Sequence, residues 1–245
     1  YVAFFKYINM VSTNLVYKTV LYMLNKEQRG YMTPAEFNRV AEQVQMEIFE
    51  KYFDDLNQQL RVPSNDSEYA NRVKDLRDRI QIFEAQTTLS QGGGGWQAVT
   101  APATAVHRIG TLEYQVAGLP PMEIEEVTRQ EYSRLTRSKL TTPSKNLFVY
   151  YRMQDTFFIY PSPQSPQTEY VLYYIRKPLQ PTWNYSIGNL GQYTYTGGQD
   201  FELSSIEQSE IILKILSYAG IIIRDPQIAQ QAAQIVGSED ANEKS

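Results

Sequence analysis

The chain has no cysteine, a single histidine and no apolar run long enough to cross a membrane. Without cysteine it can form neither a disulfide framework nor a thiolate site, and His107 alone cannot make a conventional zinc site. The apolar stretch 211–223 is too short to span a bilayer and contains Lys214, so it predicts a buried helix. These absences remove thiol-dependent and conventional zinc chemistry from the functions to consider.

An excess of positive charge is also missing. The 23 lysines and arginines are outnumbered by 27 aspartates and glutamates, which gives a formal net charge of -4. A dedicated nucleic-acid-binding protein needs a concentrated basic face for the phosphates, so this balance argues against one. It is compatible with a channel that DNA passes through without sticking to the walls.

Catalytic motifs are absent as well. No Gly-x-Ser-x-Gly pattern accompanies His107, which we expect to be a structural or surface residue. The run Gly92, Gly93, Gly94 and Gly95 is not followed by Gly-Lys-Ser or Gly-Lys-Thr, so it predicts a flexible joint and not a phosphate loop. The sequence therefore predicts no catalytic residue, no metal ligand and no cofactor.

Two groups of acidic residues deserve comparison with the carboxylate pairs of glycosidases, namely Asp54-Asp55 and Glu123 with Glu125 and Glu126. Neighbouring acids on a helix point apart, and acids in a first turn complement the helix dipole. We therefore interpret both groups as structural. The basic residues near the aromatic strands could touch nucleic acid, but solvated strand edges are the favoured interpretation. These residues are Lys139, Lys145, Arg152, Arg176 and Lys177.

Helical periodicity is clearest in the first third of the chain. Apolar residues spaced by three and four predict a helix over 12–28, capped by Ser12 or Thr13 and ended by Gly30. Thr33 to Glu36 forms a capping box with Pro34 at the first helical position. The helix that begins there extends to about Arg61, roughly 42 Å at 1.5 Å per residue. A seam over 69–83 predicts a further helix that pairs antiparallel with it.

The middle of the chain predicts strands. Residues 87–95 read as the flexible joint, and short strands follow at 96–99, 105–109, 111–116, 146–152, 156–160 and 169–175, with one helix over about 123–139. The segment 183–198 is poor in aliphatic residues and predicts an exposed loop or β-arm outside the core.

The sequence therefore predicts an α+β fold in which N- and C-terminal helices form a helical bundle with an inserted antiparallel β module. The expected regions are a long-helix region (1–91), the glycine joint (92–95), the β-rich module (96–203), C-terminal helices packing on the N-terminal ones (204–236) and a polar tail (237–245). Met10 would be a natural start, so residues 1–9 carry no weight in this interpretation.

The segment from Leu24 to Asn38, LNKEQRGYMTPAEFN, resembles the N-terminal helical hairpin of head-to-tail connector proteins, also called adaptor or ring proteins. These belong to short-tailed tailed bacteriophages, including crAss-like and related environmental phages. Two later stretches are similar to the same family: 126–132 with Pro143-Ser144, and 174–178 followed by Pro181-Thr182-Trp183. Together these loose patterns cover most of the chain.

The resemblance implies a structural virion protein without catalytic activity or cofactor. Such proteins form a closed homo-oligomeric ring, commonly of twelve copies, between the portal protein and the tail or further ring proteins. Double-stranded DNA passes through the lumen during genome packaging and ejection without sequence-specific binding. The expected location is the portal vertex of the virion, after assembly in the host cytoplasm and without membrane association. By this analogy, the helices would line the ring near the DNA and the β module would face outward.

Aromatic residues supply the candidate contacts with other subunits or partners, because the chain has 19 tyrosines and such residues suit protein interfaces. An alternative is that tyrosines simply occupy half-exposed strand faces. The contact candidates are Trp96, Trp183, Tyr185, Tyr193 and Tyr195.

Two other functions remain open from the sequence. In one, the protein is a virion or surface component whose β module binds glycan or another tail protein, and its aromatic residues stack on sugars. In the other, it is a tail hydrolase or lyase that uses Glu125 or Glu126. The absence of a convergent polar motif makes the enzyme the weakest of the three.

Overall fold

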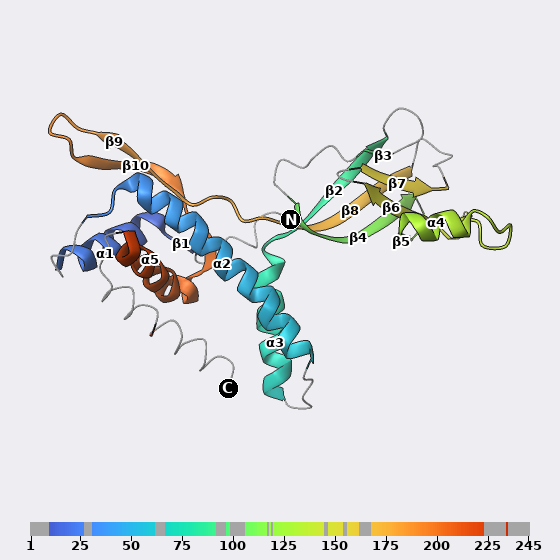
Figure 1. Cartoon of the computed structure of the whole chain (residues 1–245), viewed down its shortest axis with the longest axis horizontal. Helices are drawn as coiled ribbons and strands as arrows, with labels where there is room; N and C mark the ends of the chain where they lie inside the picture. Colours follow the sequence, from blue (N-terminus) through green and yellow to red (C-terminus); the bar gives the residue numbers. More distant parts are fainter. Residues whose placement is uncertain are drawn as a thin grey trace. The chain divides into compact units, whose positions relative to one another are not determined.

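A computed structural model describes the chain at residues 10–26, 31–61, 67–91, 97–98, 106–116, 118, 120–144, 147–153, 156–161, 168–222 and 234 (Figure 1). The chain divides into two compact units. Unit 1 combines residues up to Gln81 with those from Pro178 onward, and unit 2 is the continuous segment Ile82–Lys177. The described part contains both helices and strands, which confirms the prediction of a mixed α and β fold.

Unit 1 holds the long helices α1 (Thr13–Lys26), α2 (Pro34–Arg61), α3 (Ser67–Gln81) and α5 (Gln208–Ile222), the last preceded by a 3₁₀ turn, η2 (Ser205–Glu207). α2 packs against both α3 and α5, and α1 packs against α5. The buried face of α2 follows helical spacing and includes Phe37, Val44 and Ile48. None of the described helices is long and apolar enough to span a bilayer.

The start of α2 has both hydrogen bonds of a capping box. The backbone N–H of Glu36 donates to Thr33 Oγ1 at 3.3 Å, and the backbone N–H of Thr33 donates to Glu36 Oε2 at 2.8 Å. Pro34 occupies the first helical position, where a missing N–H leaves no hydrogen bond unmade.

Strands in unit 1 form two small pairs. β1 (Met10–Val11) pairs antiparallel with β11 (Phe201–Ser204), and β9 (Thr182–Ile187) forms a hairpin with β10 (Tyr193–Gln199). Gly198 has φ +152° and lies opposite Trp183. A Cβ at Gly198 would lie 1.9 Å from the Thr182 carbonyl oxygen, so this position of the hairpin requires glycine.

Unit 2 is a closed barrel with the strand order β2-β3-β7-β6-β5-β4-β8. Neighbouring strands are antiparallel except β5 and β6, which are parallel. The crossover that a parallel pair needs contains the short helix α4 (Arg129–Leu135). The strands are β2 (Glu84–Gln91), β3 (Gln97–Ala98), β4 (Val106–Val116), β5 (Met122–Glu126), β6 (Val149–Met153), β7 (Thr156–Tyr160) and β8 (Thr168–Arg176).

The barrel is filled by aliphatic and aromatic side chains. Leu112, Ile124, Phe157 and Leu172 are among its most buried residues. They come from different strands, so each strand contributes its inward face to one continuous core.

Several predicted boundaries are wrong. Residues 87–91 belong to strand β2, which pairs with β8 from Glu84 onward, so the barrel begins well before residue 96. The glycine run predicts a joint, but residues 87–91, which precede it, pair as a strand. Gly92 to Gly95 and Trp96 lie outside the described residues. At the other end, 178–203 belongs to unit 1 and not to the β-rich module.

The predicted helix 123–139 is also wrong at its start. Residues 122–126 form strand β5, whose single buried residue is Ile124 between exposed acidic neighbours. The helix is confined to α4, where Thr128 and Glu131 form the capping box. Glu123, Glu125 and Glu126, which were predicted to lie in the first turn of a helix, are exposed residues of strand β5.

The C-terminal region also differs from the prediction. Residues 201–204 are strand β11, and the helix α5 begins at Gln208, later than expected. Within 223–245 only residue 234 is described, and it is helical. Both the end of the predicted 204–236 helices and the predicted tail therefore lie outside the described residues.

Candidate functional site: the aromatic hairpin of unit 1

We refer to β9, β10 and the turn between them as the aromatic hairpin. Its base is Trp183, which is only 4% exposed. The indole ring lies 4.5 Å from the ring of Tyr17, centroid to centroid, and its Nε1–H donates to Asn14 Oδ1 at 3.2 Å. Both partners belong to α1, so the base of the hairpin is part of the core of unit 1. The expectation that Trp183 lies outside the core is wrong.

The side-chain amide of Asn38 also fixes this base. The backbone N–H of Trp183 donates to Asn38 Oδ1 at 2.8 Å, and Asn38 Nδ2 donates to the Trp183 carbonyl at 3.3 Å. Asn38 thereby satisfies both main-chain groups of a buried residue, which would otherwise lose their hydrogen bonds to water.

The segment that leads into the hairpin is fastened to α2 by a second amide. Gln45, 1% exposed, donates through Nε2 to the Leu179 carbonyl at 2.7 Å and accepts from the Glu202 backbone N–H at 3.0 Å. The carboxylate of Glu202 accepts from the Leu179 backbone N–H at 2.7 Å. Between these contacts, Gln180 Nε2 donates to Glu42 at 2.7 Å. Three polar residues of α2, spaced along one face, therefore hold residues 179–183.

The other end of the hairpin is bound to the start of α1. The backbone N–H of Thr13 donates to Asp200 Oδ1 at 2.8 Å, and the Thr13 hydroxyl donates to the Gln199 carbonyl at 2.7 Å. A carboxylate at a helix N-terminus satisfies a free amide and complements the helix dipole. Both ends of the hairpin are thus anchored to helices of unit 1.

Aromatic rings continue from this anchored base toward solvent. The ring of Trp183 lies 5.5 Å from Tyr195 and 6.0 Å from Tyr185, and Tyr185 lies 5.0 Å from Tyr193 in an edge-to-face arrangement. Tyr185 and Tyr193 are 36% and 37% exposed. Ring pairs at these separations support one another. The structure therefore brings four of the five predicted contact residues together on one hairpin.

The turn end of the hairpin exposes two apolar side chains. Ile187 is 65% exposed and Leu190 is 92% exposed, and the hairpin extends past the helices of unit 1 (Figure 1). Residues 182–199 contain no lysine, arginine, aspartate or glutamate, although 20% of the chain is charged. Tyrosine enrichment with depletion of charge is typical of the centre of a protein–protein interface. The aromatic hairpin is therefore suited to contact another protein chain.

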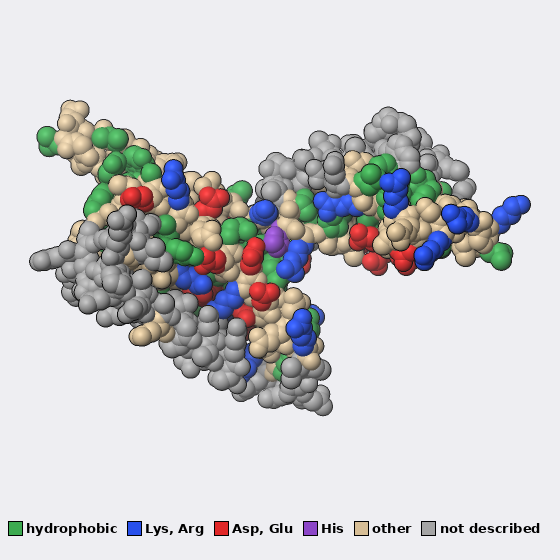
Figure 2. Space-filling model, in the orientation of Figure 1, with side chains coloured by type: hydrophobic (Ala, Val, Ile, Leu, Met, Phe, Trp, Pro, Cys, Tyr) green, Lys and Arg blue, Asp and Glu red, His purple; other side chains and the backbone are tan. Residues whose placement is uncertain are grey.

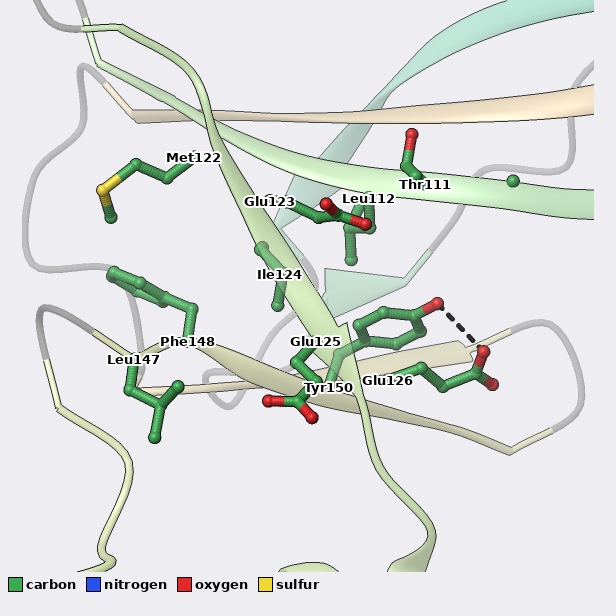
Figure 3. Close-up of a pocket in the computed structure, with 11 residues that line it drawn as sticks. Thr111, Leu112, Met122, Glu123, Ile124, Glu125, Glu126, Leu147, Phe148 and Tyr150 are labelled. Atoms are coloured by element: carbon green, nitrogen blue, oxygen red, sulfur yellow. Dashed lines mark hydrogen bonds between the residues drawn. The ribbon is translucent and has the colours of Figure 1, made fainter.

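Unit 2 has a hollow of about 550 Å³ between β4, β5 and the start of β6. We call it the acidic hollow. Figure 3 shows Met122, Leu147 and Phe148 together at one end, with Tyr150 and Glu126 at the other. Glu123 and Glu125 also line it, so its wall combines apolar and negatively charged side chains.

One hydrogen bond links polar residues of the acidic hollow. Tyr150 donates from its hydroxyl to Glu126 Oε2 at 3.3 Å (Figure 3). Burial, together with the Glu126 carboxylate, raises the pKa of Tyr150 to about 12, so the phenol is neutral and remains a donor. Within the described residues, no group of three or more metal-ligating side chains is placed to hold a metal ion.

The remaining sequence candidates are dispersed. His107 is half-buried in β4, and Asp54 and Asp55 lie on α2, the first of them exposed. Among the basic residues, the Arg152 guanidinium lies 5.9 Å from the Phe157 ring and that of Arg176 lies 5.6 Å from the Phe83 ring. Lys139 and Lys177 are exposed, and Lys145 lies outside the described residues.

Sequence patterns did not indicate the anchoring roles of Asn14, Asn38, Gln45, Asp200 and Glu202. Polar residues on a helix usually face solvent, and their partners here lie far along the chain.

No protein-family model matches the sequence. No curated protein matches it either.

Proposed function

We propose that this protein is a subunit of a head-to-tail connector ring, a structural virion protein that joins the portal vertex to the tail. The observation that carries this proposal is the aromatic hairpin: an uncharged arm with exposed apolar residues, anchored at both ends in the core of unit 1. Because both ends of the hairpin are already held by unit 1, less conformational entropy is lost on binding than for a free loop, which favours a permanent contact. The resemblance of Leu24 to Asn38 to connector proteins supports the same function.

The proposal includes an arrangement for the helices. We infer that α1, α2, α3 and α5 form a helical bundle into which the predominantly antiparallel barrel is inserted along the chain. The 28 residues of α2 would then provide a stiff strut in each subunit. The hairpin would reach the adjacent copy through a heterologous contact, and repetition of such a contact closes a ring when the rotation is suitable.

The remaining features follow from the family resemblance. The ring would hold twelve copies at the portal vertex, contact the portal protein on one side and the tail or further ring proteins on the other, and enclose double-stranded DNA without reading its sequence. Assembly would take place in the host cytoplasm. In this role the protein binds other chains and needs no cofactor, membrane or catalytic residue.

Glycan binding is less well supported. It requires Trp183 to stack on a sugar, but that side chain is 4% exposed and already packs against Tyr17. A catalytic role for Glu125 or Glu126 has little support, because the bond from Tyr150 to Glu126 is the one side-chain hydrogen bond among the described residues that line the acidic hollow. Neither alternative has an observation that favours it over protein–protein contact.

The native mass of the full chain, alone and mixed with a portal protein, tests the proposal. We expect a closed assembly for the unchanged protein and a shift toward monomer for the double variant Ile187→Ser with Leu190→Ser. The matched control is Leu60→Ser with Met153→Ser, which removes two apolar side chains that are 47% and 46% exposed on other elements. A monomer that ignores the portal protein would overturn the proposed function. An assembly unaffected by the hairpin variant would remove the hairpin from it.

A further inference from the structure

The crossover between β5 and β6 carries a concentration of positive charge. We call residues 128–144 the α4 arm. It contains Arg129, Arg134, Arg137 and Lys139 against a single acid, Glu131, in a chain whose net charge is -4. Figure 2 shows basic side chains, coloured blue, in the region of α4 and the loop after it. Among the described residues, neither Arg137 nor Lys139 forms an ion pair with a carboxylate.

The side chain of Leu140, after the end of α4, is not packed against the rest of the chain. α4 has no buried residue, and Leu140 is 97% exposed. A solvated leucine next to Lys139 gains no burial energy from the fold of its own subunit. The arm is held in shape locally, because Thr128 and Glu131 cap α4 and the hydroxyl of Thr142 donates to the Ser138 carbonyl at 2.7 Å.

The acidic hollow has the complementary properties. The stretch 112–127 contains four glutamates and no basic residue. Glu113 lies opposite Glu123 in the β4–β5 pair, while Glu125 and Glu126 continue the same negative charge along β5. Met122 and Leu147, 39% and 45% exposed, provide an apolar surface beside these carboxylates.

We propose that the α4 arm of one copy of this chain docks into the acidic hollow of a second copy. Arg137 and Lys139 would face the glutamates of the hollow, and Leu140 would pack against Met122 and Leu147. This contact is heterologous, so it extends from copy to copy, as ring assembly requires. The inference rests on the proposed function and names a second contact for the same assembly.

A nucleic acid fits the α4 arm less well than a second copy does. Phosphates would approach four glutamates in the same barrel, which repel them, and would leave the exposed leucine unused. A second copy satisfies the charge and the apolar side chain together. Opposite charges across such a contact also guide the association of the two chains.

Cysteine cross-linking of the full-length chain tests the contact, because the chain has no native cysteine to give a background. A variant with Leu140→Cys is mixed with one carrying Leu147→Cys and oxidised. We expect the cross-linked heterodimer in about tenfold excess over that from the control mixture of Leu140→Cys with Leu60→Cys, because docked thiols have a raised effective concentration. Leu60 is 47% exposed and Leu147 is 45% exposed, so the two partner positions match in accessibility. Equal yields from the two mixtures would overturn the inference.

Charge exchange provides the second measurement. One variant carries Arg137→Glu and Lys139→Glu, and the other carries Glu123→Lys and Glu125→Lys. Each alone places like charges across the contact, so we expect about a hundredfold weaker self-association, and mixing the two should restore it. Lys74→Glu with Arg77→Glu, on exposed positions of α3, is the control for the change in net charge.

The results separate this inference from the proposed function. Ring-sized assemblies without the specific cross-link and without rescue on mixing would overturn the α4 contact alone. A chain that stays monomeric and does not cross-link would overturn both. Loss of binding to double-stranded DNA in the variant with a reversed arm, with self-association unchanged, would assign the arm to nucleic acid instead.

Discussion

Asn38 and Trp183 lie 145 positions apart in the sequence, and a single side-chain amide in α2 forms hydrogen bonds with both main-chain polar groups of the tryptophan. This pairing joins the first segment of unit 1 to the second. The indole contacts α1 at the same time through Tyr17 and Asn14. The aromatic hairpin is therefore positioned by contacts at its base, which leaves its outer part available for a partner.

We predict that Asn38→Ala lowers the free energy of unfolding by about 1–3 kcal/mol, because it leaves the buried N–H and C=O of Trp183 without partners. Chemical denaturation of the full chain measures this loss. Asn57→Ala, at an exposed position on the same helix, is the control and should change stability little. Equal midpoints for the two variants would contradict the role given to Asn38.

The capping box of α2 leads to a prediction with a pH dependence. We expect Thr33→Ala to cost about 1 kcal/mol at neutral pH. Hydrogen bonds from Thr33 lower the pKa of Glu36 below its ordinary value of 4.5. Because the folded pKa is the lower one, the contribution of the Glu36 carboxylate is present above the unfolded pKa and is lost as the pH falls through the folded pKa. A Glu36→Gln variant should therefore differ from the unchanged protein at pH 7 and converge with it in acid.

A buried ion pair joins α3 to η2, and its acidic partner has a raised pKa, whereas the pKa of Glu36 is lowered. Its effect on stability should therefore depend on pH in the opposite direction. Arg79 Nη1 lies 2.5 Å from Glu207 Oε1, and the Glu207 side chain is 6% exposed. Burial raises the pKa of Glu207, although Arg79 acts to lower it. We expect Arg79→Met to destabilise the protein by about 3 kcal/mol at neutral pH, because it leaves the buried carboxylate unpaired.

The sign of that pH dependence follows from the raised pKa. The folded state takes up a proton on Glu207 more readily than the unfolded state, so stability increases as the pH falls through the folded pKa toward the unfolded pKa. The defect of Arg79→Met should shrink over that range, as measured by denaturation at several pH values. Arg77→Met, exposed on the same helix, serves as the control. A defect that is constant with pH would show that Glu207 is not the group responsible.

Gly198 offers a steric test of the aromatic hairpin. We predict that Gly198→Ala disrupts the pairing of β9 with β10, since its Cβ would lie 1.9 Å from a backbone oxygen that cannot move freely. Strain of this kind should cost at least about 1–3 kcal/mol. Ser186→Ala, exposed on the facing strand, should be neutral. Thermal unfolding of both variants compares them, and an unchanged Gly198→Ala protein would contradict the register described for the hairpin.

Local sequence signals were sufficient for some elements and not for others. Thr33, Pro34 and Glu36 determine where α2 begins through contacts within four residues, so its start was predictable. The strand β5 was not, because Glu123, Glu125 and Glu126 suit a first helical turn equally well. Pairing with β4 and β6, which local patterns do not encode, decides in favour of the strand.

In the candidate site too, some features could be predicted from local sequence and others depend on distant contacts. The prediction that residues 183–198 form an exposed loop or β-arm rested on composition, and these residues belong to the β9–β10 hairpin. The burial of Trp183 depends on Asn14, Tyr17 and Asn38, all more than a hundred residues away, so spacing could not reveal it. The acidic hollow likewise arises only when the barrel closes.

The interrupted chain path of unit 1 has a consequence for protein synthesis. α1 and α2 leave the ribosome before the rest of unit 1, and the tryptophan that packs against them is made 145 residues after Asn38. At about 5–20 residues per second, this interval lasts on the order of ten seconds. The uninterrupted segment Ile82–Lys177 is complete before that tryptophan emerges. Nascent chains should therefore acquire a protease-resistant barrel while α1 and α2 remain open to digestion or to chaperones.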